Sequence, residues 1–232
     1  KLMKRILYLL LPLLVCSGAV RAQTASELIQ KIKAKLDKVN DYEATGKMKM
    51  NVTFIKAPVA NIKVYYKKPD KLRISNEKGI SLVPKGSVNI SVAAILTSPD
   101  DYDIIDVGKE DKTGLRIIKL LPKDEEAAIV LATFYIDEKQ ELVKKAKTTT
   151  RENGTYELEL SYGSYAAYGL ADKVIFTFNT KDYKMPKGVT FDYDDGSEKE
   201  QPADKAQNKK GKIEITYTTY KVNKGVPDSV FK

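Results

Sequence analysis

Hydrophobic and polar residues alternate along most of the chain after residue 40, as they do in β-strands that are buried on one face. The clearest stretch is residues 42–54, where every second position is apolar and the positions between are mostly polar or charged. The apolar positions are Tyr42, Ala44, Met48, Met50, Val52 and Phe54. The alternation returns in residues 60–66, 156–162, 174–178 and 213–217. We therefore predict ten or eleven strands in a large sheet with one apolar face.

One convincing amphipathic helix precedes the strands, in residues 24–40. Its apolar residues fall on one helical stripe: Leu28, Ile29, Ile32, Leu36 and Val39. Thr24 or Ser26 is suited to cap its start, and Asn40 to end it. Residues 89–97 are predicted to form a short helix or a lid segment. Because so little helix cannot cover so large a sheet, the pattern predicts an apolar hollow.

Turn signals separate the strands. They are Pro69-Asp70, Lys112-Thr113-Gly114, Asp137-Glu138-Lys139, Asn153-Gly154 and Lys187-Gly188. Asn153-Gly154 is the strongest of these, because both central residues of such a hairpin turn need a positive φ. Residues 194–211 are charged, contain Gly and Pro, and show no periodicity, which predicts a long loop.

The first 22 residues have the pattern of a signal peptide. Basic residues are followed by an apolar stretch in residues 6–15 and by the cleavage site Val20-Arg21-Ala22. The apolar stretch is too short to span a membrane. The alternative is a lipoprotein signal in which Cys16 is acylated, but that site requires a small residue where Val15 stands. We therefore expect an exported protein with one domain in residues 23–232.

Composition excludes several classes of function. The 232-residue chain has no histidine and no tryptophan, and its single cysteine is Cys16. Histidine- or cysteine-based catalysis and metal binding are therefore absent, and no cofactor is expected. A carboxylate pair, a Ser-Lys dyad or a tyrosine remains chemically possible, but the aspartate clusters lie in turn-like, polar segments. We interpret these acids as exposed loop residues and the chain as a protein without enzymatic activity.

The net charge is modest once the signal region is set aside. The whole chain carries +9, and residues 1–22 contribute four basic residues and no acid, which leaves +5. Lysines are spread over most strands beside nearly as many acids. This distribution favours a solvated outer face over a nucleic-acid groove.

Residues 63–84 (KVYYKKPDKLRISNEKGISLVP) resemble the LolA/LolB group of bacterial lipoprotein-sorting proteins. That group has a strand ending in a basic residue and proline, a short turn, a strand with an aromatic residue or Leu-Arg, and then a glycine-containing turn. The leading helix, the turn-linked strands and the closing Tyr220-Lys221-Val222-Asn223 with Phe231 follow the same order. The resemblance covers residues 24–232.

The resemblance implies an α+β fold: an incomplete, half-open antiparallel β-barrel with an N-terminal amphipathic helix and a short lid helix over an apolar cavity. We expect alternating apolar residues to line the cavity: Met48, Met50, Val64, Tyr66, Leu72, Ile74, Phe176 and Phe178. Leu28, Ile32 and Leu36 would form the lid. The basic residue at the cavity mouth matches Lys68, and the position after the turn matches Arg73. The group more often has arginine at the first of these sites, and lysine lacks its forked geometry, so Arg73 is expected to gate the mouth more strongly.

The resemblance further implies a periplasmic carrier of a Gram-negative-type bacterium, which binds lipoprotein acyl chains for outer-membrane sorting. Its partners would be acylated lipoproteins or lipids, an inner-membrane donor and an outer-membrane acceptor, with the carrier acting as a monomer and without nucleic acid. A sensor of lipid or misfolded lipoprotein on the same fold is the alternative of another class, and an exported enzyme is a third.

We predict that cleavage after Ala22 leaves Gln23 as the N-terminus of a freely soluble periplasmic protein. The intact mass of the protein from a periplasmic extract would measure this directly. A diacylglyceryl adduct on Cys16, or protein that pellets with membranes until detergent is added, would contradict the prediction and favour an anchored protein.

Overall fold

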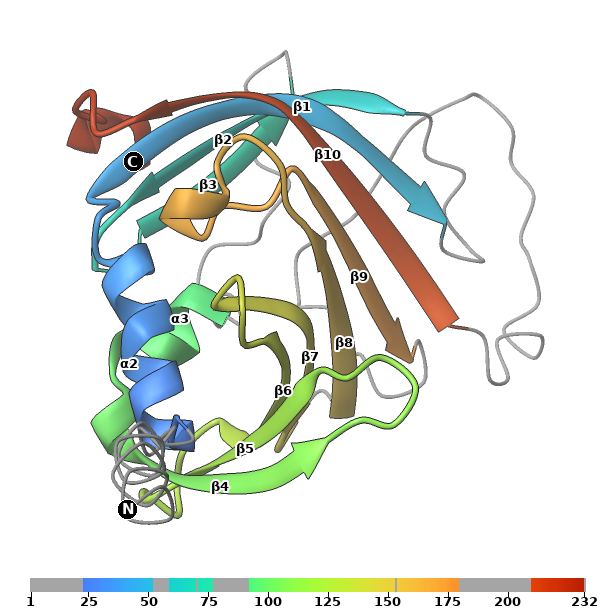
Figure 1. The fold of residues 1–232 in the computed structure, drawn as a ribbon. Helices are drawn as coiled ribbons and strands as arrows, with labels where there is room; N and C mark the ends of the chain where they lie inside the picture. The colour runs from blue at the N-terminus through green and yellow to red at the C-terminus, as the bar shows by residue number, and fades with distance from the viewer. Residues whose placement is uncertain are drawn as a thin grey trace, which may run out of the picture.

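The structure, a computed structural model, describes residues 23–51, 59–69, 71–76, 92–152, 154–179 and 210–231. Within them the chain forms ten antiparallel strands in one sheet (Figure 1). The strands are β1 (Asp41–Asn51), β2 (Ala60–Lys67), β3 (Lys71–Asn76), β4 (Tyr102–Lys109), β5 (Arg116–Pro122), β6 (Ile129–Asp137), β7 (Leu142–Thr150), β8 (Gly154–Ser161), β9 (Lys173–Asn179) and β10 (Lys210–Val222). The predicted signal peptide, Cys16 and most of the predicted loop at 194–211 lie outside the described residues.

The strands are ordered β3-β2-β1-β10-β9-β8-β7-β6-β5-β4. All neighbours in this order are also neighbours along the chain, except that β1 pairs with β10. The sheet curves into a C shape, and β3 and β4 are its edges, so it does not close into a barrel (Figure 1). The predicted half-open α+β barrel is therefore confirmed.

Two α-helices, α2 (Ala25–Leu36) and α3 (Val92–Thr97), lie together at the open side of the C (Figure 1). Short 3-10 helices occur at η2 (Pro99–Asp101), η3 (Ala166–Tyr168) and η5 (Asp228–Phe231). The helical alternative for residues 89–97 is confirmed from Val92 onward.

Helix α2 begins at the first of the two predicted caps. The Thr24 hydroxyl accepts a hydrogen bond from the Glu27 amide, and the Glu27 carboxylate accepts one from the Thr24 amide. The helix ends at Leu36, four residues before Asn40, because Asp37 caps it and the next residues form a tight turn into β1. Val39 is nevertheless buried, at 3% exposure, as its place in the apolar stripe predicted.

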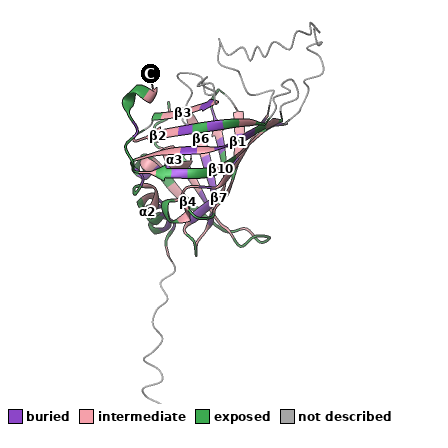
Figure 2. Cartoon of the chain, turned by 90° about the horizontal axis from the view of Figure 1, so that it is seen from above, coloured by how far each residue is buried: buried purple, intermediate pink, exposed green. Residues whose placement is uncertain are grey.

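Apolar residues of the inner sheet face gather in two main clusters. The larger one joins α2 and α3 to β5, β6, β7 and β8. Its fully buried members include Leu28, Ile29, Leu96, Ile118, Leu120, Phe134 and Ile136. The second cluster is built on Ala44, Met48, Ile62, Val64 and Tyr220, and none of its described members comes from α2 or α3. More buried and more exposed positions alternate along β1, β2, β5 and β8 (Figure 2). Apolar side chains nevertheless remain exposed on β4, β5 and β6, at Ile105, Val107, Leu121 and Val130.

A β-bulge keeps the apolar side chains of β10, the longest strand, on the concave face of the sheet. Thr45 pairs with Thr219, but Gly46 pairs with Tyr217, so Thr218 is an extra residue in β10. Tyr220 and Tyr217 consequently share one face, although they are three residues apart. Without the extra residue, the half of β10 before Thr218 would turn its apolar side chains outward.

We predict that Gly46→Ala destabilises the fold, because a Cβ at this position would collide with the carbonyl oxygen of Thr216. Overpacking of this kind costs about 1–3 kcal/mol in the free energy of unfolding. Urea denaturation followed by circular dichroism would measure it. Lys47→Ala, at the exposed next position, is the control and should stay within about 0.5 kcal/mol of the wild type. Equal stability of the two variants would show that the bulge tolerates a side chain.

Candidate functional site

Rows of apolar side chains cross the concave face of the sheet from strand to strand. The longest row contains seven residues in register, each paired with the next: Met50, Ile213, Phe176, Leu158, Ala146, Phe134 and Ile118. It runs from β1 to β5 without a polar residue. Neighbouring strands lie about 4.8 Å apart, so six steps give a continuous apolar surface roughly 29 Å long around the curve.

The predicted cavity residues of β1, β2 and β3 lie together in the second cluster. Val64 pairs with Ile74, and Tyr66 pairs with Leu72. Met48 and Val64 are buried there, whereas Met50, Leu72 and Ile74 remain partly exposed. The structure therefore brings these side chains to one surface that is only partly covered.

Phe176 and Phe178 lie further along the same concave face, on β9. Their rings contact each other at 5.2 Å between centroids, and Phe178 lies over Gly211 of β10. Phe176 packs against both the larger cluster and a small cluster formed by Tyr156 and Phe178. It thus connects the part of the face under the helices with the part away from them.

The predicted lid residues cover only one half of the sheet. Leu28 and Ile32 are almost fully buried, in the larger cluster with β5 to β8. Leu36 is partly buried against the same cluster and lies next to Gly169. Within the described residues, helix α2 is therefore placed over the β4 to β9 side, and the predicted cavity residues of β1 to β3 belong to a different cluster.

Five tyrosines gather at one end of the concave face, and only Tyr66 among them was predicted as a cavity residue. Tyr42, Tyr66, Tyr165, Tyr217 and Tyr220 are linked through ring contacts with centroid distances from 4.9 to 5.4 Å. The Tyr220 hydroxyl donates a hydrogen bond to Ala171 O at 2.7 Å, and the Tyr165 hydroxyl to Tyr220 O at 3.2 Å. Burial raises the pKa of Tyr217 to about 12 and also raises that of Tyr42 and Tyr220, so these phenols stay neutral. Four of these tyrosines lie on strands. Their spacing in the sequence does not indicate a binding site, because aromatic residues are common in any sheet.

Lys68 and Arg73, the predicted gating residues, make different contacts. The Lys68 ammonium donates to the Asp37 carbonyl oxygen at 2.9 Å and lies 3.3 Å from the Asp37 carboxylate, at the end of α2. Arg73 donates to Val230 O in η5 at 2.5 Å. It is Lys68, not Arg73, that reaches the helix over the hollow.

Asp37 joins the end of α2 to two lysines. Hydrogen bonding from Lys33 and then from Lys68 lowers the pKa of the Asp37 carboxyl, against an opposing effect of burial. A lowered carboxyl pKa stabilises the folded form above the unfolded value near 4, and this contribution is lost as the pH falls through the lowered value. At neutral pH the contact is therefore fully charged.

The opposite side of α2 is held by the β6–β7 hairpin. Lys31 and Lys35 lie 3.5 and 3.3 Å from the carboxylate of Glu141, and Lys35 also donates to Gln140 O. Arg116 donates to Gln23 O at 2.6 Å, just before the helix. Polar contacts thus hold α2 along its outer surface while its apolar stripe packs against the concave face of the sheet.

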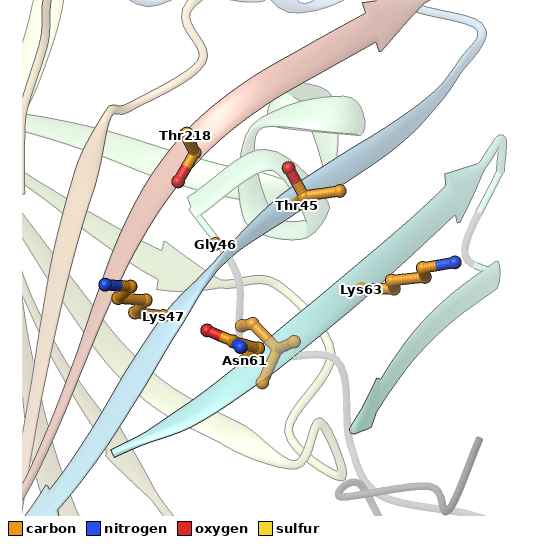
Figure 3. A pocket seen from close by; sticks show the side chains of 7 residues that line it. Thr45, Gly46, Lys47, Asn61, Lys63 and Thr218 are labelled. Atoms are coloured by element: carbon orange, nitrogen blue, oxygen red, sulfur yellow. The ribbon is translucent and has the colours of Figure 1, made fainter. Parts of the chain in front are cut away.

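A separate pocket of about 240 Å³ lies over β10, β1 and β2 at the bulge (Figure 3). Its lining residues are Thr45, Gly46, Lys47, Asn61, Ile62, Lys63 and Thr218. Lys47 and Lys63 are exposed and alternate with inward-facing Met48, Ile62 and Val64, which places this shallow pocket on the outer face.

Solved structures of other proteins share this architecture, and three of them illustrate the similarity. A domain described as an outer-membrane lipoprotein-sorting protein from Vibrio parahaemolyticus superposes with a TM-score of 0.54 and 10% identity, covering 88% of this chain and 94% of its own. A LolA superfamily protein from Nitrosomonas europaea gives 0.56 and 10%, with 91% and 98% covered. A DUF1329 family protein from Desulfovibrio piger gives 0.54 and 12%, with 90% and 95% covered.

The chain has the LolA fold. The resemblance noted in residues 63–84 is thereby confirmed for the fold over most of the chain. No family model matches the sequence, and the search of curated proteins found no match. No helix among the described residues is long and apolar enough to cross a membrane.

We predict that Lys68→Met loosens the end of α2 in this LolA fold without unfolding the protein. The contact is partly exposed, so its loss should change the free energy of unfolding by at most about 1 kcal/mol. Amide hydrogen exchange, read by mass spectrometry, should become faster in the last turn of α2 than in its first turn.

Lys63→Met is the matched control, because Lys63 lies on β2, the strand that ends just before Lys68, and has no ion-pair partner within the described ranges. Arg73→Met should instead affect exchange around η5. Unchanged protection of α2 in the Lys68 variant would show that the other contacts of the helix are sufficient to hold it.

Proposed function

We propose that this protein binds the acyl chains of lipoproteins, or of related lipids, in its hollow and carries them during outer-membrane lipoprotein sorting. The observation that carries the proposal is the seven-residue apolar row across the concave face, only part of which lies under α2 and α3. The lipoprotein-sorting description of the Vibrio parahaemolyticus domain, which has the same fold, supports this choice of ligand.

An acyl chain is a suitable ligand because the concave surface is large, apolar and uncharged. Each CH₂ group that leaves water contributes about 0.8 kcal/mol, so binding needs no covalent chemistry. Met48 and Met50 favour variable apolar ligands, since the flexible thioether side chain adapts its shape. Among the described residues, no group of acids, histidines or cysteines is placed to hold a metal ion. We propose a binding protein and not an enzyme.

The proposed cycle requires α2 to move, because its apolar stripe fills the hollow over β5 to β8. The polar contacts of α2 at Lys68 and at Glu141 are suited to this, since each is partly exposed and individually weak. Breaking them would let an acyl chain replace Leu28, Ile29 and Ile32 against the sheet. We further propose a periplasmic monomer that takes its cargo from an inner-membrane donor and passes it to an outer-membrane acceptor.

A charge on the concave face should abolish binding. We predict that Met50→Asp and Ile74→Asp lose uptake of a fluorescent fatty acid, because a carboxylate is desolvated when hydrocarbon packs against it. Fluorescence titration would measure the affinity, and circular dichroism would verify the fold.

Asn51→Asp is the matched control, since it adds the same charge one residue away on the exposed side of β1. Met50→Leu, which keeps the apolar volume, should also bind normally. Full uptake by folded Met50→Asp and Ile74→Asp variants would contradict the proposal that acyl chains bind on the concave face. Release of radiolabelled lipoprotein from spheroplasts, with transfer to outer-membrane vesicles, would then test carriage separately from binding.

A further inference from the structure

Two buried hydroxyl groups interrupt the apolar concave face at one point. Thr148 of β7 and Tyr156 of β8 are paired residues and are only 0% and 4% exposed. They belong to a row that runs across six strands in register: Phe178, Tyr156, Thr148, Ala132, Leu120 and Ile104. All other members of this row are apolar.

Neither hydroxyl has a hydrogen-bond partner among the described residues. Burial raises the pKa of Tyr156, and the nearby Thr148 hydroxyl opposes the rise, yet the two groups do not meet in hydrogen-bonding geometry. Two other largely buried phenols of the described residues are bonded: Tyr162 donates to Val143 O and Tyr220 to Ala171 O. Leaving a buried hydroxyl unbonded is unfavourable, so such a pair in an apolar wall indicates a missing acceptor.

We propose that Thr148 and Tyr156 form a hydrogen-bonding site for the ester or amide carbonyl oxygen of a bound acyl group, an inference that rests on the proposed function. Both side chains are neutral donors, and no charged residue belongs to their row. A charged head group would be desolvated here without compensation, whereas a carbonyl oxygen needs only a donor. The acyl chain would then extend along Ala132 and Leu120.

The arrangement also explains why the pair is unbonded in this form. Ala132 and Leu120 are covered by the cluster that contains Leu28 and Ile32 of α2. A ligand reaches the hydroxyls only when α2 leaves that surface and the neighbouring Phe176 ring, 5.5 Å from the Tyr156 ring, shifts. The unbonded hydroxyls thus stabilise the ligand-bound protein relative to the ligand-free protein. They also determine how far into the protein the carbonyl group of the ligand lies.

The test compares two lipids that differ only in the carbonyl group, 1-palmitoylglycerol and 1-O-hexadecylglycerol, as displacers of a fluorescent fatty-acid probe. The wild type should bind the ester about tenfold more tightly, the factor that corresponds to one hydrogen bond of about 1.4 kcal/mol. Tyr156→Phe combined with Thr148→Val should remove this preference and leave binding of the ether lipid unchanged. An ester preference that persists in the double variant, or is absent in the wild type, would overturn the inference alone. If the wild type bound neither of the two lipids, the proposed function would be overturned as well.

Stability of the ligand-free protein provides an independent readout. Tyr156→Phe should leave the melting temperature unchanged or raise it, because it removes an unbonded buried hydroxyl. The control Tyr162→Phe removes a bonded hydroxyl and should lower it. An equal loss in both variants would show that Tyr156 is already bonded in the empty protein, contrary to the inference.

Discussion

The structure depends on how a ten-stranded sheet hides a single apolar face. An open sheet of this width must curve or acquire a cover, and within the described residues the curved sheet is covered by one helix of 12 residues and one of six. Three side chains of α2 and two of α3 are buried at 3% exposure or less against the strands from β5 onward. The half around β1, β2 and β10 instead packs its own tyrosines, methionines and aliphatic residues together.

The bulge at Thr218 satisfies the same constraint within a single strand. Strand β10 has 13 residues and pairs with both β1 and β9, so it must keep its apolar residues inward through a strong bend. The extra residue supplies the bend and shifts the alternation by one position. Gly46 provides the room for it, because a side chain there would meet the Thr216 carbonyl.

The alternation of apolar and polar residues with period two was sufficient to predict the strands and the apolar face of the sheet. It also predicted that little of the chain is helical, because each of these features depends on local burial. The alternation placed Met48 and Val64 on the apolar face of the sheet, and the helical stripe in residues 24–40 placed Leu28 and Ile32 on the apolar face of the helix. The sequence did not predict that these two sets would lie in different clusters, since which half of a sheet a helix covers depends on tertiary packing. The change of face at Thr218 was also missed, because a bulge is defined by its partner strand. Lys68 and Arg73 were both placed near the mouth by resemblance, but their different partners depend on where α2 and η5 end.

Helix α2 and an acyl chain would compete for the same surface under the proposed function. Leu28, Ile29 and Ile32 each contribute about 1.5–3 kcal/mol when fully buried, or roughly 5–9 kcal/mol together. An acyl chain with about fifteen CH₂ groups would contribute about 12 kcal/mol on the same scale, and a chain half as long about 6 kcal/mol. Only the longer chain exceeds the helix by a clear margin, and part of that margin is offset by the lost contacts of Lys68 and Glu141. A lid that fills the hollow therefore protects an apolar face from water in the empty protein and, by the same contacts, sets a minimum chain length for the ligand.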